Sequence, residues 1–249
     1  MKVEDIKVIA VLGAGTMGHG ITQLAAMAGY KVYMMDIAQE FLNRGMDRIK
    51  WSLGKLVSKG RISQEEAEMV IGRIKPTVSL KEAVENADFV IEAVPEKIEL
   101  KKQVFAEVDK YAPKHAVLAT NTSSLPISEI AGATKRPEKV VGMHFFNPPQ
   151  IMRLVEIIRG DKTSDETVKI TAELAKKFGK DVVYVNKDVP GFIVNRILAR
   201  LMNEACLTVE RGEAEVVEVD SAIKYKVGTP MGMMELADFS GVDAVSYTH

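Results

Sequence analysis

Apolar residues in the first 185 positions form short runs, as expected for strands buried on both faces of a sheet. These runs predict strands at 7–13, 31–36, 87–94, 116–122, 139–146, 153–158 and 181–185. Between them, apolar residues spaced three and four positions apart predict helices at 18–29, 97–111, 124–131 and 164–178. Repeated strand–helix–strand units indicate an α/β, Rossmann-like fold with a doubly wound parallel sheet.

The region 38–75 departs from this alternation, because two helical patterns follow the second strand and separate near residues 59–61. Ser63 with Glu66 three residues later is the capping-box pattern that starts the second helix. Trp51, in the first helix, is expected in the core. A helical excursion therefore leaves the sheet between its second strand and the next one.

The pattern changes again in the turn-rich segment NKDVPG, residues 186–191. From Phe192 onward the spacing is helical. The sequence predicts an α/β domain at 1–187 and a mainly helical domain at 188–249. Within the helical part, Cys206 has apolar neighbours and is expected to be a small buried or interface residue.

Composition excludes several classes of protein. The 249 residues include 33 Lys and Arg against 34 Asp and Glu, so there is no basic excess for nucleic-acid binding. A single cysteine excludes a framework of internal disulfides and fits a cytoplasmic location. No apolar run approaches the roughly 20 residues of a membrane span.

A glycine-rich turn follows the first strand and opens the first helix. It reads Gly13-Ala14-Gly15-Thr16-Met17-Gly18, and the second strand ends at Asp36. In this setting the turn is typical of a dinucleotide site, with the helix N-terminus facing the pyrophosphate. The Asp36 carboxylate would accept hydrogen bonds from the ribose and repel a 2′-phosphate. NAD is therefore expected rather than NADP; a glycine turn used only for packing is the alternative.

A histidine and a glutamate lie symmetrically about a double-proline segment. His144 and Glu156 are each six residues from Gln150. If the chain reverses near Gln150, the carboxylate can orient the imidazole, which titrates near neutral pH and suits proton transfer. The alternative is a strand-end histidine and a solvated glutamate. No His or Cys spacing typical of a metal site is present, so no metal is expected.

Four further motifs carry a family resemblance: ATNTSSL (119–125), HFFNP (144–148), VPGFIVNR (189–196) and GTPMG (228–232). With the glycine turn, they show that the sequence resembles the 3-hydroxyacyl-CoA dehydrogenase family over about residues 5–245. The resemblance implies NAD-dependent interconversion of 3-hydroxyacyl-CoA and 3-ketoacyl-CoA, such as acetoacetyl-CoA. It also implies a homodimer formed through the helical domain. Members normally continue beyond the last segment, some into a fused enoyl-CoA hydratase, so the chain is expected to be shortened.

The resemblance also implies roles for residues around the reacting atoms. His144 is then the general base and Glu156 its partner. Ser123 and Asn195 correspond to positions that contact the reacting oxygen of the substrate. Asn147 is expected to shape its loop first and to contact substrate second. From the residues alone, Ser123 is equally well explained as a turn or helix-cap serine.

Other matched positions concern the cofactor and coenzyme A. Glu96 and Lys101 correspond to positions near the nicotinamide ribose, and Asn121 to a cofactor contact. A solvated helix start explains Glu96 and Lys101 equally well. Ser52 and Lys59 correspond to coenzyme A contacts in a locally basic stretch, which could also be an ordinary solvated face.

Two other functions remain compatible with these residues. The first is an NAD-dependent dehydrogenase of a free 3-hydroxy acid, because only the basic stretch at 50–61 favours coenzyme A. The second is a non-catalytic NAD-binding module, if the shortened helical domain disables the site.

Overall fold

The computed structural model describes residues 1–240. The remaining positions of the expected helical domain, 241–249, lie outside the described residues. The chain divides into two compact units, Met1–Asp188 and Val189–His249.

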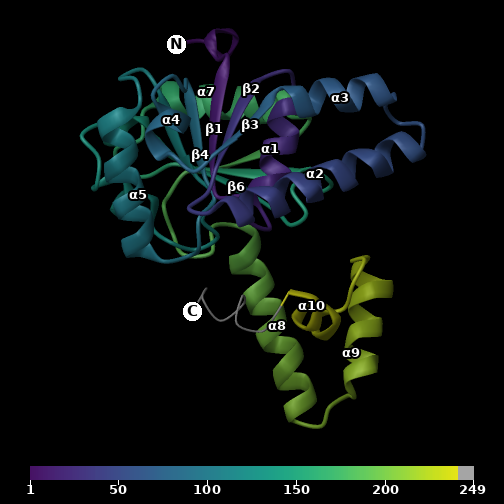
Figure 1. The fold of residues 1–249 in the computed structure, drawn as a ribbon. Helices are drawn as coiled ribbons and strands as arrows, with labels where there is room; N and C mark the ends of the chain where they lie inside the picture. The colour runs from purple at the N-terminus through teal and green to yellow at the C-terminus, as the bar shows by residue number, and fades with distance from the viewer. Residues whose placement is uncertain (241–249) are drawn as a thin grey trace. The chain divides into compact units, whose positions relative to one another are not determined.

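The first unit is built on an eight-stranded sheet of order β3-β2-β1-β4-β5-β6-β7-β8 (Figure 1). Neighbouring strands run parallel except for the antiparallel pair β6 and β7. The strands are β1 (Val8–Leu12), β2 (Lys31–Met35), β3 (Ile74–Thr77), β4 (Phe89–Glu92), β5 (Val117–Thr120), β6 (Val140–Phe145), β7 (Leu154–Ile158) and β8 (Asp181–Val185).

Two features of the sheet differ from the prediction. The expected parallel arrangement is wrong at β6 and β7, because the segment between them is too short for the crossover that parallel strands need. The region 38–75 is not helical to its end, since β3 begins at Ile74 and forms one edge of the sheet.

Helices cover both faces of this sheet. In chain order they are α1 (Gly18–Met27), α2 (Gln39–Ser58), α3 (Gln64–Gly72), α4 (Leu80–Val84), α5 (Ile98–Tyr111), α6 (Ile127–Ala131) and α7 (Asp165–Lys177). The short helix α4 has no counterpart in the prediction. The capping box that starts α3 is confirmed: Ser63 Oγ accepts a hydrogen bond from Glu66 N, and Glu66 Oε2 accepts one from Ser63 N. Helices α2 and α3 project from the sheet as a pair (Figure 1).

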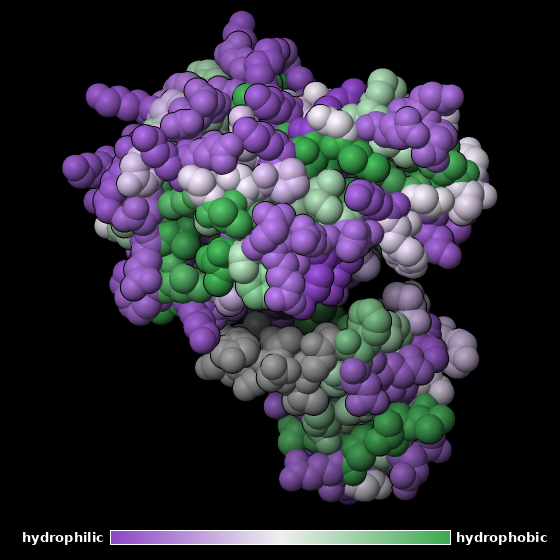
Figure 2. Space-filling view, in the orientation of Figure 1, coloured by the Kyte–Doolittle hydropathy of each residue, from purple (hydrophilic) through white to green (hydrophobic). Residues whose placement is uncertain are grey.

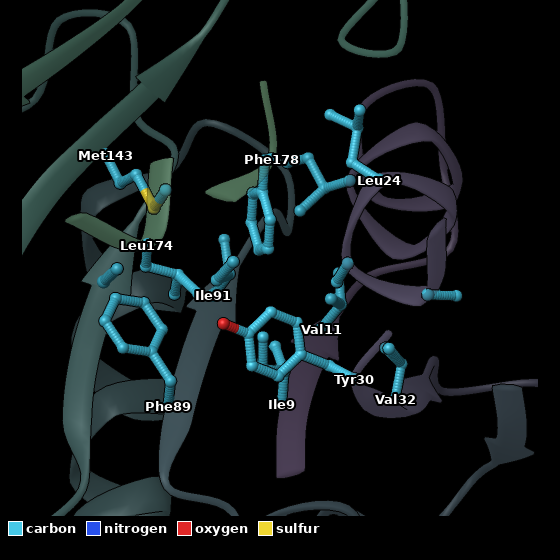
Figure 3. Close-up of a cluster of buried hydrophobic side chains, with 14 of the residues drawn as sticks. Ile9, Val11, Leu24, Tyr30, Val32, Phe89, Ile91, Met143, Leu174 and Phe178 are labelled. Carbon is cyan, nitrogen blue, oxygen red and sulfur yellow. The ribbon is translucent and has the colours of Figure 1, made fainter. Parts of the chain in front are cut away.

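Successive side chains along each central strand point to opposite faces of the sheet, so the buried side chains form two sets. One set packs against α1 and α7, and Figure 3 shows it converging from the strands and both helices. The rings of Tyr30 and Phe178 meet edge to face there, with centroids 6.1 Å apart. The members of this set on the strands include Ile9, Val11, Val32, Phe89, Ile91 and Met143. The intervening residues of β4 to β7 face the opposite side, where the candidate site lies.

The second unit contains α8 (Val194–Glu210), α9 (Val216–Ala222), a π-helix (Ile223–Val227) and α10 (Met233–Ser240). Its small core includes Met202, Ala205 and Met233. Apolar residues also lie on its surface over α9 (Figure 2), where Val217 is 75% exposed. One expectation about burial is wrong, because Trp51 in the first unit is 68% exposed with Lys55 over its ring. Cys206 is exposed rather than buried, and its alternative place at an interface stays a prediction.

Candidate active site

Each glycine of the turn between β1 and α1 has its own geometric setting. Gly13 has φ +104°, and a Cβ there would lie 2.5 Å from the Ala93 carbonyl oxygen. A Cβ on Gly18 would lie 1.7 Å from the Gly13 carbonyl oxygen. A Cβ on Gly15 would meet nothing within 4 Å. Gly13 and Gly18 are therefore required by the protein's own packing, whereas Gly15 borders open space.

That open space is a cavity of about 830 Å³. Residues 13–17 of the turn, including Thr16 and Met17, line it together with Asp36 and residues 93–95. Asp36 Oδ2 accepts a hydrogen bond from Ala14 N, and Oδ1 accepts one from Ile37 N, both at 2.7 Å. The acid is thus fixed beside the turn. Donors at a helix N-terminus with an adjacent carboxylate fit the pyrophosphate and ribose of NAD.

His19 lies in the first turn of α1, directly behind the glycine turn. Its Nδ1 is 2.7 Å from the Gly15 carbonyl oxygen. Burial of the imidazole, helped by the charge of Arg48, lowers the pKa of His19, although the hydrogen bond to Gly15 acts in the opposite direction. His19 therefore supports the turn, and its burial disfavours the charged form of the imidazole.

The antiparallel pair β6 and β7 brings His144 and Glu156 together. The two residues are directly opposite in the strand register. His144 Nδ1 is 2.7 Å from Glu156 Oε2, and the residues are 4% and 0% exposed. An ionised carboxylate only accepts hydrogen bonds, so this contact places the proton of a neutral imidazole on Nδ1. The basic lone pair of the ring is then on Nε2.

The segment joining β6 and β7 is held in place by contacts with Lys180 and with helix α1. Lys180 directly precedes β8 and is buried, and its Nζ donates to the Pro149 carbonyl at 2.6 Å and to the Met152 carbonyl at 2.8 Å. Helix α1 approaches the same segment, since a Cβ on Gly20 would lie 2.5 Å from Pro149 Cγ. Lys180 was not among the sequence-predicted residues. An isolated lysine before a strand carries no signal of such a role.

The turn after β5 is organised by a carboxylate from another strand end. Glu96 Oε1 accepts hydrogen bonds from the backbone N–H groups of Ser123 at 2.8 Å and Ser124 at 3.3 Å. Asn121 Oδ1 accepts one from Phe145 N at 2.8 Å, next to His144. Glu96, Asn121 and Ser123 therefore belong to one neighbourhood at the carboxyl ends of β4, β5 and β6.

Lys101 reaches the same neighbourhood from α5. Its side chain is fully buried, and its Nζ is 2.7 Å from Glu92 Oε1 and 3.3 Å from Glu96 Oε2. A solvated helix start is therefore wrong for Lys101. Glu92 was missed by sequence reasoning, although an acid inside the apolar strand run ADFVIEAV could have marked it.

The remaining predicted residues lie in other parts of the chain. Ser52 lies within α2 and Lys59 at its C-terminal end, where Lys59 is exposed. Asn147 is exposed and precedes a cis peptide bond to Pro148. Asn195 is the second residue of α8, in the second unit.

Residues 1–240 lack two kinds of feature. In that range no group of three or more His, Cys, Asp or Glu side chains could hold a metal ion. Within the same residues, no helix is both long and apolar enough to cross a membrane.

Comparison with known families covers nearly the whole chain. The model of the 3-hydroxyacyl-CoA dehydrogenase NAD binding domain matches residues 8–189, and that of the 3-hydroxyacyl-CoA dehydrogenase C-terminal domain matches residues 191–249. The chain belongs to the 3-hydroxyacyl-CoA dehydrogenase family. It is thus an NAD-dependent 3-hydroxyacyl-CoA dehydrogenase.

Individual 3-hydroxyacyl-CoA dehydrogenases agree. A probable 3-hydroxybutyryl-CoA dehydrogenase of Bacillus subtilis is 47% identical over 96% of this chain and 83% of its own length. The crystal structure of (S)-3-hydroxybutyryl-CoA dehydrogenase PaaH1 from Ralstonia eutropha has a TM-score of 0.94 and 37% identity, covering 98% of this chain and 86% of that one. A fatty acid oxidation complex subunit alpha of Pseudomonas savastanoi is 42% identical over 96% of this chain but only 33% of its own length. Sequences similar to this chain therefore also occur within a much longer polypeptide.

Proposed function

We propose that the protein oxidises short-chain (S)-3-hydroxyacyl-CoA to 3-ketoacyl-CoA, reversibly, with His144 as the general base and Glu156 as its partner. The observation that carries the proposal is the buried 2.7 Å contact between His144 Nδ1 and Glu156 Oε2. The substrate class is supported by the relatives named 3-hydroxybutyryl-CoA dehydrogenases.

The proposed chemistry divides the two hydrogens of the alcohol between cofactor and protein. NAD, when bound, supplies the acceptor for the hydride that leaves carbon 3. His144 takes the hydroxyl proton at Nε2, because Glu156 holds the other proton of the ring at Nδ1. Glu156 then stabilises the imidazolium that forms. In the reverse direction the His144 imidazolium is the acid and returns the Nε2 proton to the substrate oxygen.

Binding residues complete the proposal. Ser123 and Asn195 orient the reacting oxygen by hydrogen bonds, with Asn147 as an additional contact. Ser52 and Lys59 contact coenzyme A, whose phosphates are attracted to the basic stretch. The four basic residues in this part of the chain are exposed and pair with no described carboxylate: Lys50, Lys55, Lys59 and Arg61.

The general base is tested by replacing His144 with glutamine. Turnover of acetoacetyl-CoA with NADH is expected to fall by roughly 10²- to 10⁴-fold, the usual contribution of a general acid or base. The dissociation constant for NADH is expected to stay unchanged. His115→Gln is the matched control, because the His115 side chain is 52% exposed and its Nε2 lies 2.9 Å from Asp88 Oδ1, outside the proposed site. Turnover that survives His144→Gln would show that the assigned base is wrong.

Substrate alternatives are separated in the same assay. Acetoacetyl-CoA and free acetoacetate are compared as substrates for the unaltered protein. A preference for the free acid would favour the dehydrogenase of a free 3-hydroxy acid. Binding of NADH without turnover of either compound would favour the non-catalytic NAD-binding module.

The oligomeric state, the cellular location and a fusion to a second enzyme are three further proposals. We propose a homodimer formed through the helical unit, where apolar residues such as Val217 and Tyr225 are exposed. Sedimentation velocity measures its mass directly. A cytoplasmic location and a hydratase fused in a longer polypeptide are the other two, and the length of the native polypeptide decides the last.

A further inference from the structure

A buried acid at the end of β4 makes contacts that none of the proposed roles uses. Glu92 is 0% exposed. Its Oε1 accepts hydrogen bonds from Val94 N and Lys101 Nζ, both at 2.7 Å. Its Oε2 accepts one from Thr120 Oγ1 at 2.6 Å, on the neighbouring strand β5. Both carboxylate oxygens therefore form hydrogen bonds inside the protein. Glu92 can act on a ligand only through these partners and not by direct contact.

Lys101 joins this acid to a second one. Its Nζ is 3.3 Å from Glu96 Oε2, and the Glu96 side chain is 30% exposed whereas Glu92 and Lys101 are buried. Two carboxylates and one ammonium group carry a formal charge of −1. The triad Glu92–Lys101–Glu96 therefore has one unit of negative charge left over, and Glu96 is the member that reaches the surface.

The sheet order indicates which half of the cofactor lies beside this triad. The strand order changes direction between β1 and β4, and open α/β sheets bind dinucleotides at that point. Asp36 directly follows β2 and is placed for the ribose of the adenosine half. The nicotinamide half then lies on the other side of the glycine turn, over β4 and β5. Residues 93–95, which directly follow Glu92, line the cavity.

The nicotinamide ring changes its charge during the reaction. It is positively charged in NAD⁺ and neutral in NADH, whereas the rest of the two cofactor forms is the same. A fixed negative charge close to the ring therefore stabilises the oxidised form relative to the reduced form. Burial of Glu92 and Lys101 limits the screening of this effect by solvent.

We propose that Glu92 sets the relative affinity of this enzyme for NAD⁺ and NADH. By neutralising Lys101, Glu92 leaves the charge of Glu96 uncompensated beside the nicotinamide. The proposal rests on the NAD site, and it is independent of the proposed base His144. Glu92 is a positioning residue in this scheme, and its effect is on the ratio of the two affinities.

The test is Glu92→Gln, which keeps the shape of the side chain and removes its charge. The amide oxygen can still accept from Val94 N and Lys101, and the amide nitrogen can donate to Thr120 Oγ1. Dissociation constants are measured without substrate, from NADH fluorescence and from its competition by NAD⁺. The ratio of the NAD⁺ constant to the NADH constant is expected to rise about five- to twenty-fold, as for loss of one charge roughly 10 Å away at an intermediate dielectric.

Three variants make the result decisive. Thr120→Val removes a neutral partner of Glu92 and is expected to leave the ratio unchanged. Glu92→Asp keeps the negative charge that Glu92→Gln removes, so its ratio is expected to lie closer to that of the unaltered protein. Glu96→Gln makes the same change in net charge at a partly exposed position, so it is expected to raise the ratio even if Glu92→Gln does not fold.

Either of two results would overturn the proposal. One is an equal loss of affinity for NAD⁺ and NADH in Glu92→Gln, which would mean a structural role only. The other is an unchanged ratio in Glu96→Gln. Because no substrate is present, neither result depends on whether His144 is the catalytic base.

Discussion

Alanine substitutions at Gly15 and Gly18 are predicted to separate the two tasks of the glycine turn. Neither residue has a positive φ, so alanine is acceptable to the backbone at both positions. A Cβ on Gly18 would overlap the Gly13 carbonyl oxygen at 1.7 Å, and backbone cannot yield as a flexible side chain does. A Cβ on Gly15 would meet nothing within 4 Å in the protein, but it would stand in the cavity.

The magnitudes follow from this difference. The extra methyl group of Gly18→Ala overpacks this position, which lowers the free energy of unfolding by about 1–3 kcal/mol. At roughly 2–4 °C per kcal/mol for a domain of this size, the Tm of Gly18→Ala falls by about 2–12 °C without ligand. Gly15→Ala is expected to keep its Tm without ligand and to lose about tenfold or more in NAD affinity, because its methyl group occupies the approach to the pyrophosphate.

Thermal unfolding with and without NAD measures both effects. At 100 times the dissociation constant, NAD stabilises the unaltered protein by about 2.7 kcal/mol, and this increment is expected to shrink in Gly15→Ala. Gly54→Ala is the control, since Gly54 lies in α2 with open space around it and away from the cavity lining. The reasoning is refuted if Gly18→Ala unfolds like the unaltered protein, or if Gly15→Ala binds NAD with full affinity.

Three further predictions concern the surroundings of the site. Gly20→Ala is expected to displace Pro149 and lower turnover more than NAD affinity, which steady-state kinetics and nucleotide titration together can show; equal losses in both would contradict it. Lys180→Met removes two charge-assisted hydrogen bonds, each worth about 1.5–3 kcal/mol, and is expected to lower the unfolding free energy and turnover without changing NAD affinity. The folded-state pKa of His19 lies below its ordinary value of 6.5, so the unfolded chain binds the proton first and stability is lost as the pH falls below about 6.5. Urea unfolding of His19→Gln between pH 7.5 and 5 should show a weaker dependence on pH than the unaltered protein, and equal slopes would argue against the assigned pKa direction.

Local patterns were sufficient for most of the elements. Continuous apolar runs identified β1, β4 and β5, and the Ser63 capping box located the start of α3. The strand β3 was missed because its residues Ile74–Thr77 include two exposed positions and Pro76, and they follow directly on a helical pattern. Its place at the edge of the sheet explains both features, since an edge strand tolerates proline and need not be apolar on both faces.

The candidate site was less accessible to sequence reasoning where it depends on pairing between distant segments. Lys101 looked like a surface residue because lysine is rarely buried, and its ion pairs with Glu92 and Glu96 outside its own helix explain its burial. Trp51 looked like a core residue because of its size, but α2 projects from the sheet and leaves it exposed. In both cases the deciding contact, or its absence, is a property of the assembled fold.

The hairpin of β6 and β7 has a consequence for how related sequences are compared. The side chains of His144 and Glu156 are aligned by the hydrogen-bonding ladder of the sheet. The chemistry proposed for them therefore requires opposite positions on adjacent strands and not a fixed number of intervening residues. Insertions or deletions confined to the connecting loop can leave that alignment intact. A shift of one strand by a single residue, by contrast, would turn one of the two groups to the other face of the sheet and separate them at unchanged composition.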